Sequence, residues 1–349
     1  QALHQDVRRN GLHSNVFIGS RLVSTYGKCG SIVEAENVFQ GLQHPDAIAW
    51  SAMMSAYVEV GDGERALQLF NQIEGKYLIL DEQIFVIALQ ACCGLARNEN
   101  EVAGISPSQK VEALEIGRGL HADARRKGFS SNAYVCNSLL SIYERCGEIS
   151  IAQNLFFGSS RGSLVLWNTM LSAYVEHDQP NKALRLYKLM HKEGQRPGER
   201  TFVTILQACS ICAEKEEAIF VDKSLLKVRS FVMGSAVHVD ARREGFDTNE
   251  YVVSALLNMY GKCGSLEDAC KIFDRMNQRN IVSWNVMISI YSQHGHTKEA
   301  ICAVHKMQEE QIIPNKITFI AVISACSHGG MLVEGCTNLC PLKLSLEVY

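Results

Sequence analysis

Apolar residues recur with helical spacing along this chain. Trp50, Met53, Met54 and Tyr57 lie at positions i, i+3, i+4 and i+7, which places them on one face of a helix. A break that contains glycine follows at residues 61–63, and a second helical segment begins there. Glycine favours the end of one helix, and a neighbouring Ser or Asp favours the start of the next. The pattern therefore predicts helical hairpins.

The hairpin pattern returns at a fixed interval. Trp50, Trp167 and Trp284 are the three tryptophans of the chain and are spaced 117 residues apart. A fixed period indicates a repeat array, in which each hairpin buries its apolar face only by stacking on its neighbours. We therefore expect an all-α fold, a superhelical solenoid of stacked helix-turn-helix hairpins. The spacing also predicts that the tryptophans belong to the core.

Each block of 117 residues divides into a short unit of 31 residues, a standard unit of 35 and a long unit of 51. The predicted divisions of a single array, residues 1–349, are 1–15 (partial long unit), 16–46 (short), 47–81 (standard), 82–132 (long with insert), 133–163 (short), 164–198 (standard), 199–249 (long with insert), 250–280 (short), 281–315 (standard) and 316–349 (incomplete long unit).

The long units exceed the standard ones by 16 residues. The first insert, roughly residues 97–112, contains Ser106-Pro107 and is expected to form a surface loop. The second, roughly residues 214–229, has fewer helix-breaking residues and is expected to extend a helix. The last long unit lacks the insert, so the array does not depend on it. Pro341 is expected to interrupt the closing helix.

The net charge and the lengths of the apolar runs limit which classes of binding partner are expected. The formal net charge is −3, which argues against a strongly basic, non-specific nucleic-acid binder. No apolar run approaches the ~18 residues of a membrane span, so we expect no membrane partner. The chain starts at Gln1 inside a repeat, which suggests an excised segment or a processed form.

Several cysteines follow the repeat. Six of the thirteen recur at the 117-residue period and are expected to be small, reduced core residues: Cys29, Cys146, Cys263, Cys92, Cys209 and Cys326. The set His191, Glu193, Cys209 and Cys212 has the spacing of a zinc deaminase site. No other block repeats that set, so we expect no metal, no cofactor and no catalytic residue. The phased histidines His4, His121 and His238 are expected to be packing or surface residues.

Four motifs show which kind of repeat this is. They are Tyr-Gly-Lys-Cys-Gly-Ser-Leu-Glu-Asp-Ala at residues 260–269, Val-Ser-Trp-Asn-Val-Met-Ile at 282–288, Ile-Pro-Asn at 313–315, and Thr-Phe-Ile-Ala-Val-Ile-Ser-Ala-Cys at 318–326. They resemble the pentatricopeptide repeat family, and specifically the plant arrays in which short, standard and long repeats alternate. The signature of tetratricopeptide repeats, which share the hairpin architecture, is absent.

The resemblance implies sequence-specific binding of single-stranded RNA, with one base per repeat. In this family the fifth and the last residue of a repeat read the base. The pairs are Ser20 with Asp46, Asn137 with Ser163, and Ser254 with Asn280 in the short repeats, and Ser51 with Asp81, Asn168 with Gly198, and Asn285 with Asn315 in the standard ones. The long repeats offer weaker readers: Val86 with Asn132, Val203 with Asn249, and Ile320. By family usage the pairs favour G, G, any, C, pyrimidine, any, A and C from 5′ to 3′.

The family also uses the second residue of each repeat to pack against bases. Here these are Phe17, Ile48, Tyr134, Val165, Tyr251, Val282 and Ile317. Phosphate contacts are expected from Lys28, Arg145 and Lys262, at the end of the first helix of each short repeat.

Arrays of this plant type resemble organellar factors for RNA processing or C-to-U editing, which act in the mitochondrion or chloroplast. The cytidine deaminase-like domain of such factors is not seen here, so this chain is not expected to be an enzyme. A deaminase domain or an editing cofactor protein would act in trans, and no small-molecule substrate is implied. A protein-binding helical scaffold and a metal-dependent deaminase remain as alternatives.

Overall fold

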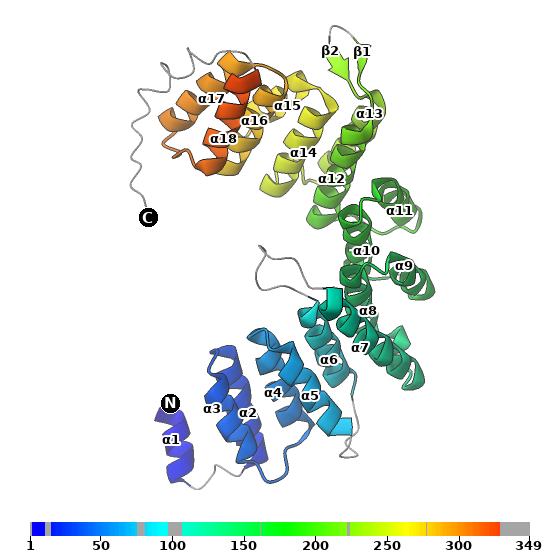
Figure 1. The fold of residues 1–349 in the computed structure, drawn as a ribbon, viewed down its shortest axis with the longest axis vertical. Helices are drawn as coiled ribbons and strands as arrows, with labels where there is room; N and C mark the ends of the chain where they lie inside the picture. The colour runs from blue at the N-terminus through cyan, green and yellow to red at the C-terminus, as the bar shows by residue number, and fades with distance from the viewer. Residues whose placement is uncertain are drawn as a thin grey trace. The chain divides into compact units, whose positions relative to one another are not determined.

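The structure is a computed structural model that describes residues 2–10, 15–74, 81–96, 107–160, 162–221, 224–276 and 278–328. The chain divides into two compact units, Gln1–Ala173 and Tyr174–Tyr349. Helices account for nearly all of the regular secondary structure among the described residues (Figure 1). Of the loop expected at roughly residues 97–112, residues 97–106 lie outside the described residues. Residues 107–112 are helical, so that part of the expectation was wrong, because proline is favoured at the first position of a helix and Pro107 begins one here. The expected interruption at Pro341 also lies outside the described residues.

The first unit is built from helical hairpins. Its elements are α1 (Ala2–Arg9), α2 (Val16–Lys28), α3 (Ile32–Gln40), α4 (Ala47–Glu59), α5 (Gly63–Glu74), α6 (Glu82–Leu95), α7 (Pro107–Arg126), the 3₁₀ turn η2 (Phe129–Ser131), α8 (Ala133–Cys146), α9 (Ile149–Gly158) and most of α10 (Leu164–Glu176).

The second unit begins within α10 and continues the same plan. Its elements are α11 (Pro180–Lys192), α12 (Glu199–Lys215), β1 (Ile219–Val221), β2 (Ser224–Leu226), α13 (Val228–Arg243), α14 (Glu250–Cys263), α15 (Leu266–Asp274), α16 (Ile281–Gln293), α17 (Thr297–Glu309) and α18 (Lys316–His328).

Within each unit the first helices of successive hairpins pack on one another. Helices α2, α4, α6 and α8 form this layer in the first unit, and α12, α14, α16 and α18 form it in the second. Second helices such as α3, α5 and α7 pack against their own first helix and against the next one, as α5 does against α4 and α6. The described hairpins therefore stack in two layers, as the all-α repeat pattern predicts.

The three tryptophans lie in the core between these layers. Trp50, Trp167 and Trp284 are buried, and each meets the edge of a phenylalanine from the preceding second helix. The ring centroids are 4.9 Å apart for Phe39 and Trp50, 5.0 Å for Phe156 and Trp167, and 4.8 Å for Phe273 and Trp284. Edge-to-face pairs of this kind add to the burial energy. The sequence prediction that the tryptophans are core residues is confirmed.

The second insert differs from its prediction. Helix α12 ends at Lys215, and an antiparallel hairpin follows in which Ile219 pairs with Leu226 and Phe220 with Leu225. The expectation of an extended helix was wrong. Ile, Phe and Val favour strands, and Glu216 caps a new helix by accepting hydrogen bonds from the backbone N–H groups of Arg229 (2.8 Å) and Ser230 (2.9 Å).

The phased cysteines are buried with two exceptions. Cys92, Cys209, Cys263 and Cys326 are buried, whereas Cys146 is half-buried and Cys29 is exposed. The prediction of six core cysteines was therefore wrong for Cys29. Cys263 is covered by the long unit that precedes it, whereas α1 is the only described element before α2. No described helix is long and apolar enough to cross a membrane.

Candidate nucleic-acid interface

The residue that ends most predicted units also caps the helix that follows. Asp46 Oδ1 accepts a hydrogen bond from the backbone N–H of Ala49 at 2.8 Å, and Asp81 Oδ1 accepts one from Ile84 at 2.8 Å. The same capping role is filled by Asn132, Asn249, Asn280 and Asn315, which precede α8, α14, α16 and α18. Gly198, before α12, has no side chain to cap with. Six of the predicted last-position residues are thus fixed in place by helix capping.

Two of the predicted reader pairs are in direct contact. Ser20 Oγ lies 3.2 Å from Asp46 Oδ1, and Asn285 Nδ2 donates to Asn315 Oδ1 at 3.2 Å. In each pair, a residue of one first helix meets the cap of the next first helix. The structure therefore brings together side chains that are 26 and 30 residues apart in sequence.

Both pairs also use part of their hydrogen-bonding capacity within the protein. Ser20 is 3% exposed and its hydroxyl lies 2.7 Å from Val16 O. Asn285 is 7% exposed, and its Oδ1 accepts a hydrogen bond from Thr318 Oγ1 at 2.6 Å. These side chains are consequently held in defined rotamers beside the surface and are not free to reorient.

In three further pairs, Ser51–Asp81, Asn137–Ser163 and Ser254–Asn280, no hydrogen bond joins the two members among the described residues. Asn137 accepts from Thr169 Oγ1 at 2.8 Å rather than bonding Ser163, and Ser51 Oγ donates to Ile48 O at 3.0 Å. Ser254 makes no hydrogen bond to Asn280, which caps α16 and donates to Glu250. Asn168 and Gly198 fall in different units of the chain.

The weaker readers of the long units have other contacts. Asn132 donates to Glu82, and Asn249 Nδ2 donates to Glu199 Oε2 at 2.8 Å. Val86 and Val203 are half-buried. Ile320 is exposed on α18. Their aliphatic side chains provide no hydrogen-bonding group at the surface.

Every residue predicted to pack against a base is exposed. Phe17, Ile48, Tyr134, Val165, Tyr251, Val282 and Ile317 expose between 52% and 76% of their surface. All lie at the second residue of a first helix. Single exposed apolar residues are common on proteins, but a recurrence at one helical position in each short and standard repeat is not expected from chance.

A cavity in the first unit contains candidates of all three kinds. Its volume is about 240 Å³ and it lies between α2 and α4. Ser20 and Ser51 are the candidate base readers in its wall, Ile48 is the candidate packing residue, and Lys28 is the candidate phosphate contact. Polar, apolar and cationic groups therefore face one space, as a nucleotide requires.

The three phosphate candidates differ in their surroundings. Lys28 is the last residue of α2, and its side chain is exposed. Arg145 is half-buried, and its Nε has no hydrogen-bond partner in the described part of the chain. Lys262 Nζ lies 2.8 Å from Glu214 Oε1, a carboxylate at the end of the neighbouring long-unit helix. Lys28 is thus the most available of the three for a phosphate.

The zinc-like set has the geometry of packing residues. Cys209 is fully buried, and burial raises the pKa of its thiol to about 12, which disfavours the thiolate that zinc needs. His191 Nε2 is 3.8 Å from Asp240 Oδ2. Among the described residues, no group of three His, Cys, Asp or Glu side chains is arranged to hold a metal ion.

The phased histidines take part in a contact that the sequence reasoning missed. The Nδ1 atoms of His4, His121 and His238 lie 2.9, 2.8 and 3.0 Å from the hydroxyls of Tyr26, Tyr143 and Tyr260, respectively. Each pair is separated by 22 residues, and both members recur at the 117-residue period. That shared phase could have indicated the contact. The histidines are packing residues that join a long unit to the next short unit.

The repeats of this chain also match the sequence profiles of a known family. The sequence matches the profile of the PPR repeat family over residues 163–210 and 279–328, and that of the PPR repeat over residues 48–78 and 251–281. The chain belongs to the pentatricopeptide repeat family. Whether it is of the plant type with three alternating repeat lengths remains a prediction.

Relatives of this pentatricopeptide repeat chain occur in Arabidopsis thaliana. The pentatricopeptide repeat-containing protein CRR2, chloroplastic, is 31% identical over 95% of this chain and 47% of its own length. The pentatricopeptide repeat-containing protein At3g53360, mitochondrial, is 31% identical over 94% of this chain and 38% of its own length. The chain thus spans less than half the length of these two relatives.

Among solved structures, the pentatricopeptide repeat protein PPR10 from maize covers 97% of this chain and 60% of its own chain. The sequence identity is 17% and the TM-score is 0.34. A TM-score this low does not establish a shared overall arrangement.

Proposed function

We propose that this pentatricopeptide repeat chain binds single-stranded RNA in a sequence-specific manner, through the surface formed by its first helices. The observation that carries the proposal is the exposed apolar residue at the second position of each short and standard repeat, for example Tyr134 and Tyr251. Three residues later on the same helix lies the polar reader, Asn137 or Ser254. A base held against the first side chain would present its edge to the second.

The energetics favour selective rather than general binding. Packing of a base on an aromatic side chain contributes about 1–3 kcal/mol, and the hydrogen bonds of the readers discriminate between bases. The chain has a net charge of −3 and few free cations along this surface, so attraction to phosphates is weak. Most of the affinity would then come from contacts that depend on sequence.

The decisive test exchanges one reader. Selection from a pool of random RNA should yield a preferred base at each repeat, and Ser254→Asn should change the preference at its own position from A to a pyrimidine. Ala255→Ser, one residue further along α14, is the matched control and should leave all preferences unchanged. The proposal is wrong if no base register emerges, or if Ser254→Asn leaves the preferred base as it was.

A wider role follows from the names of the two relatives described above, one of which is called chloroplastic and the other mitochondrial. We infer that the RNA is an organellar transcript and that binding selects a site for RNA processing or C-to-U editing. A deaminase domain or editing protein acting in trans would carry out the reaction, and this chain would select the RNA site. A protein-binding scaffold is the competing function, and failure of the RNA selection would favour it.

A further inference from the structure

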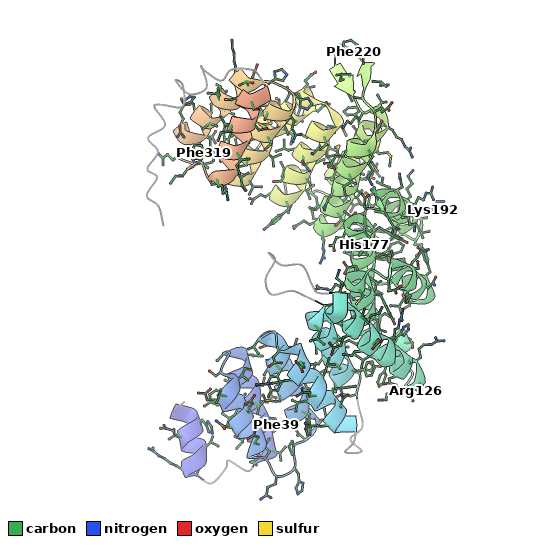
Figure 2. The ribbon with its side chains drawn as sticks, in the orientation of Figure 1. Phe39, Arg126, His177, Lys192, Phe220 and Phe319 are labelled. Carbon is green, nitrogen blue, oxygen red and sulfur yellow. The ribbon has the colours of Figure 1, made fainter. Side chains whose placement is uncertain are left out.

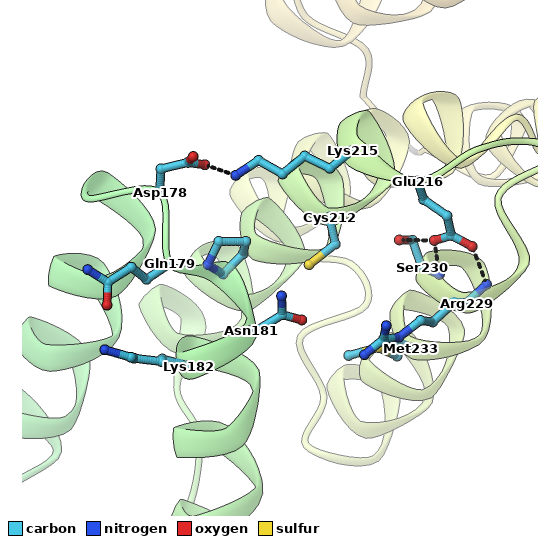
Figure 3. Close-up of a pocket in the computed structure, with 11 residues that line it drawn as sticks. Asp178, Gln179, Asn181, Lys182, Cys212, Lys215, Glu216, Arg229, Ser230 and Met233 are labelled. Carbon is cyan, nitrogen blue, oxygen red and sulfur yellow. Dashed lines mark hydrogen bonds and ion pairs between the residues drawn. The ribbon is translucent and has the colours of Figure 1, made fainter.

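A second surface of interest lies in the second unit, among its second helices. Two adjoining cavities of about 430 Å³ and 370 Å³ open between α11 and α13. Both are lined by Asn181, Arg229 and Met233, so they adjoin, and together we call them the α11–α13 groove. Figure 3 shows Arg229 and Met233 of α13 directed toward Asn181 of α11. A volume of several hundred Å³ is the size of a small-ligand site.

The groove exists because the two helices meet at one end only. Tyr187 of α11 donates a hydrogen bond to Asp240 of α13 at 3.3 Å, which joins the C-terminal halves of the helices. At the other end the β1–β2 hairpin is inserted before α13, and Glu216 fixes the start of that helix through the Ser230 hydroxyl at 2.6 Å. The N-terminal halves stay apart, and Cys212 of α12 lines the space between them.

The groove carries an excess of positive charge. Five cationic side chains line it: Lys182, Arg185, Lys188, Lys215 and Arg229. The two acidic residues in the lining are already engaged, because Asp178 pairs with Lys215 at 2.5 Å and Glu216 caps α13 (Figure 3). Among the described residues, Arg185, Lys188 and the guanidinium of Arg229 have no ion-pair partner. These three cations are therefore available to an external anion.

The repeat itself shows that these charges are not needed for packing. The buried Ala183 of α11 has alanine counterparts in α5 and α17, Ala66 and Ala300. The exposed positions are not retained in the same way. Where α11 has Arg185 and Lys188, α5 has Gln68 and Asn71, and α17 has Cys302 and His305. Where α13 has Arg229, α7 has Glu112. The basic character is specific to this one groove in a chain of net negative charge.

We propose that the α11–α13 groove is a phosphate-binding site. Guanidinium groups offer paired donors that match phosphate oxygens, and ammonium groups add charge. Gln179 precedes α11 and makes no side-chain capping bond. Pro180 has no N–H, so the backbone N–H of Asn181 is the first amide donor of the helix and has no capping side chain. The phosphate would belong either to the backbone of a bound RNA or to a free nucleotide. The site lies in the second-helix layer and does not depend on the readers.

The test removes the three unpaired charges together. The variant carries Arg185→Gln, Lys188→Gln and Arg229→Gln, and its control carries Arg275→Gln, Lys298→Gln and Lys306→Gln, three exposed cations elsewhere in the second unit. Calorimetric titration with inorganic pyrophosphate at fixed ionic strength should give binding to the wild type and control, and at least a tenfold weaker binding to the groove variant. Equal binding to all three proteins, or none, overturns the proposal.

Two further titrations identify the source of the phosphate. If it is RNA, the slope of log affinity against log salt should decrease by about 2 in the groove variant, from ~0.7 for each of three lost contacts. Base preference should stay unchanged, which separates this result from failure of the readers. If it is a free nucleotide, adenosine triphosphate should bind the groove and the RNA slope should not move. Binding of a poly-glutamate peptide but of neither phosphate ligand contradicts the proposal and indicates an acidic protein partner.

Discussion

At single positions, contact distances decide which substitutions the array can accept. Gly63, at the start of α5, is buried, and a Cβ atom added to it would lie 2.5 Å from the carbonyl oxygen of Ala91. That neighbour is backbone in α6 and cannot rotate away. Gly119, in the middle of α7, would meet nothing within 4 Å. The two glycines therefore have opposite consequences for the same substitution.

We predict that Gly63→Ala lowers the free energy of unfolding by about 1–3 kcal/mol through overpacking. Gly119→Ala should instead raise it by about 0.5–1 kcal/mol, because alanine is the better helix former at an open position. Urea unfolding followed by circular dichroism measures both. A neutral or stabilising effect of Gly63→Ala would contradict the close approach of α5 and α6.

The His–Tyr contacts make stability depend on pH. Burial, assisted by nearby Arg125 and Arg242, respectively, lowers the pKa of His121 and His238 below the usual 6.5. Below pH 6.5 the unfolded chain takes up these protons before the folded one does, so stability falls as the pH falls. We predict that the double variant His121→Gln, His238→Gln loses less stability than the wild type between pH 7.5 and 5.5.

Urea midpoints at the two pH values provide that measurement. His296→Gln, which changes an exposed histidine beside Glu299, is the control and should behave as the wild type does. The contribution of the histidines is refuted if the double variant is as sensitive to acid as the control.

At the scale of helices, the sequence predicted starting points better than it predicted the inserts. Helices α2, α4 and α6 begin at Val16, Ala47 and Glu82, where the repeat units were expected to begin. Those positions recur in each block, so the repeats support one another. The β1–β2 hairpin has no counterpart to align with, and strands of three residues leave too short a pattern to separate from a helix.

In the candidate interface too, some features follow from the repeat period and others do not. The exposure of the second-position residues is consistent with the helical period, because a residue two positions before the tryptophan lies about 200° around the helix and so faces away from the core. The engagement of Lys262 by Glu214 did not follow from it, since that ion pair joins a long unit to a short one across 47 intervening residues. Contacts between units are set by packing that the period does not encode.

The hairpin end of α13 depends on one carboxylate. Burial opposes the charge of Glu216, but hydrogen bonds from Ser230 and from the backbone of Arg229 outweigh it and lower the pKa of the carboxyl. The stabilising charge is therefore present above the ordinary pKa and is lost as the pH falls through the lowered value. We predict that Glu216→Gln costs about 1 kcal/mol at pH 7, as loss of a helix cap usually does.

The difference between Glu216→Gln and the wild type should shrink as the pH falls below about 4, where both side chains are neutral. Thermal unfolding across that range measures it. Glu217→Gln, an exposed neighbour, is the control. A difference that persists unchanged in acid would show that the cap does not act through its charge.

The hairpin also presents apolar side chains to solvent. Phe220 and Leu225 are cross-strand neighbours on the same face, and both are exposed, Phe220 by 74% (Figure 2). Among the described residues, strands occur in the second long unit and in neither of the other long units that follow a standard repeat.

For the molecule as a whole, the cations beside the candidate base readers decide how strongly salt can weaken RNA binding at the surface of the first helices. Lys28 is exposed, whereas Lys262 is already paired with Glu214. We predict that Lys28→Ala weakens RNA binding and lowers the salt slope by about 0.7, the contribution of one phosphate contact. Lys262→Ala should have a smaller effect, because binding a phosphate there would first require its ion pair to open.

Fluorescence anisotropy with the selected RNA at several salt concentrations distinguishes the two lysines. Glu214→Gln provides the complementary measurement, since it frees Lys262 and should strengthen binding. Equal losses from Lys28→Ala and Lys262→Ala, with no gain from Glu214→Gln, would contradict this assignment.

The capping role of Asp46, Asn280 and Asn315 limits how this protein can evolve new targets. A residue before a helix is tolerated best when it is Asn, Asp, Ser, Thr or Gly, and most others cost about 1 kcal/mol. If these residues also read bases, base recognition at these positions is limited to the few amino acids that helix capping permits. Substitutions among those amino acids would change the preferred RNA sequence with little change in the free energy of unfolding. A lineage of such chains could then change its targets one repeat at a time while each intermediate stays folded.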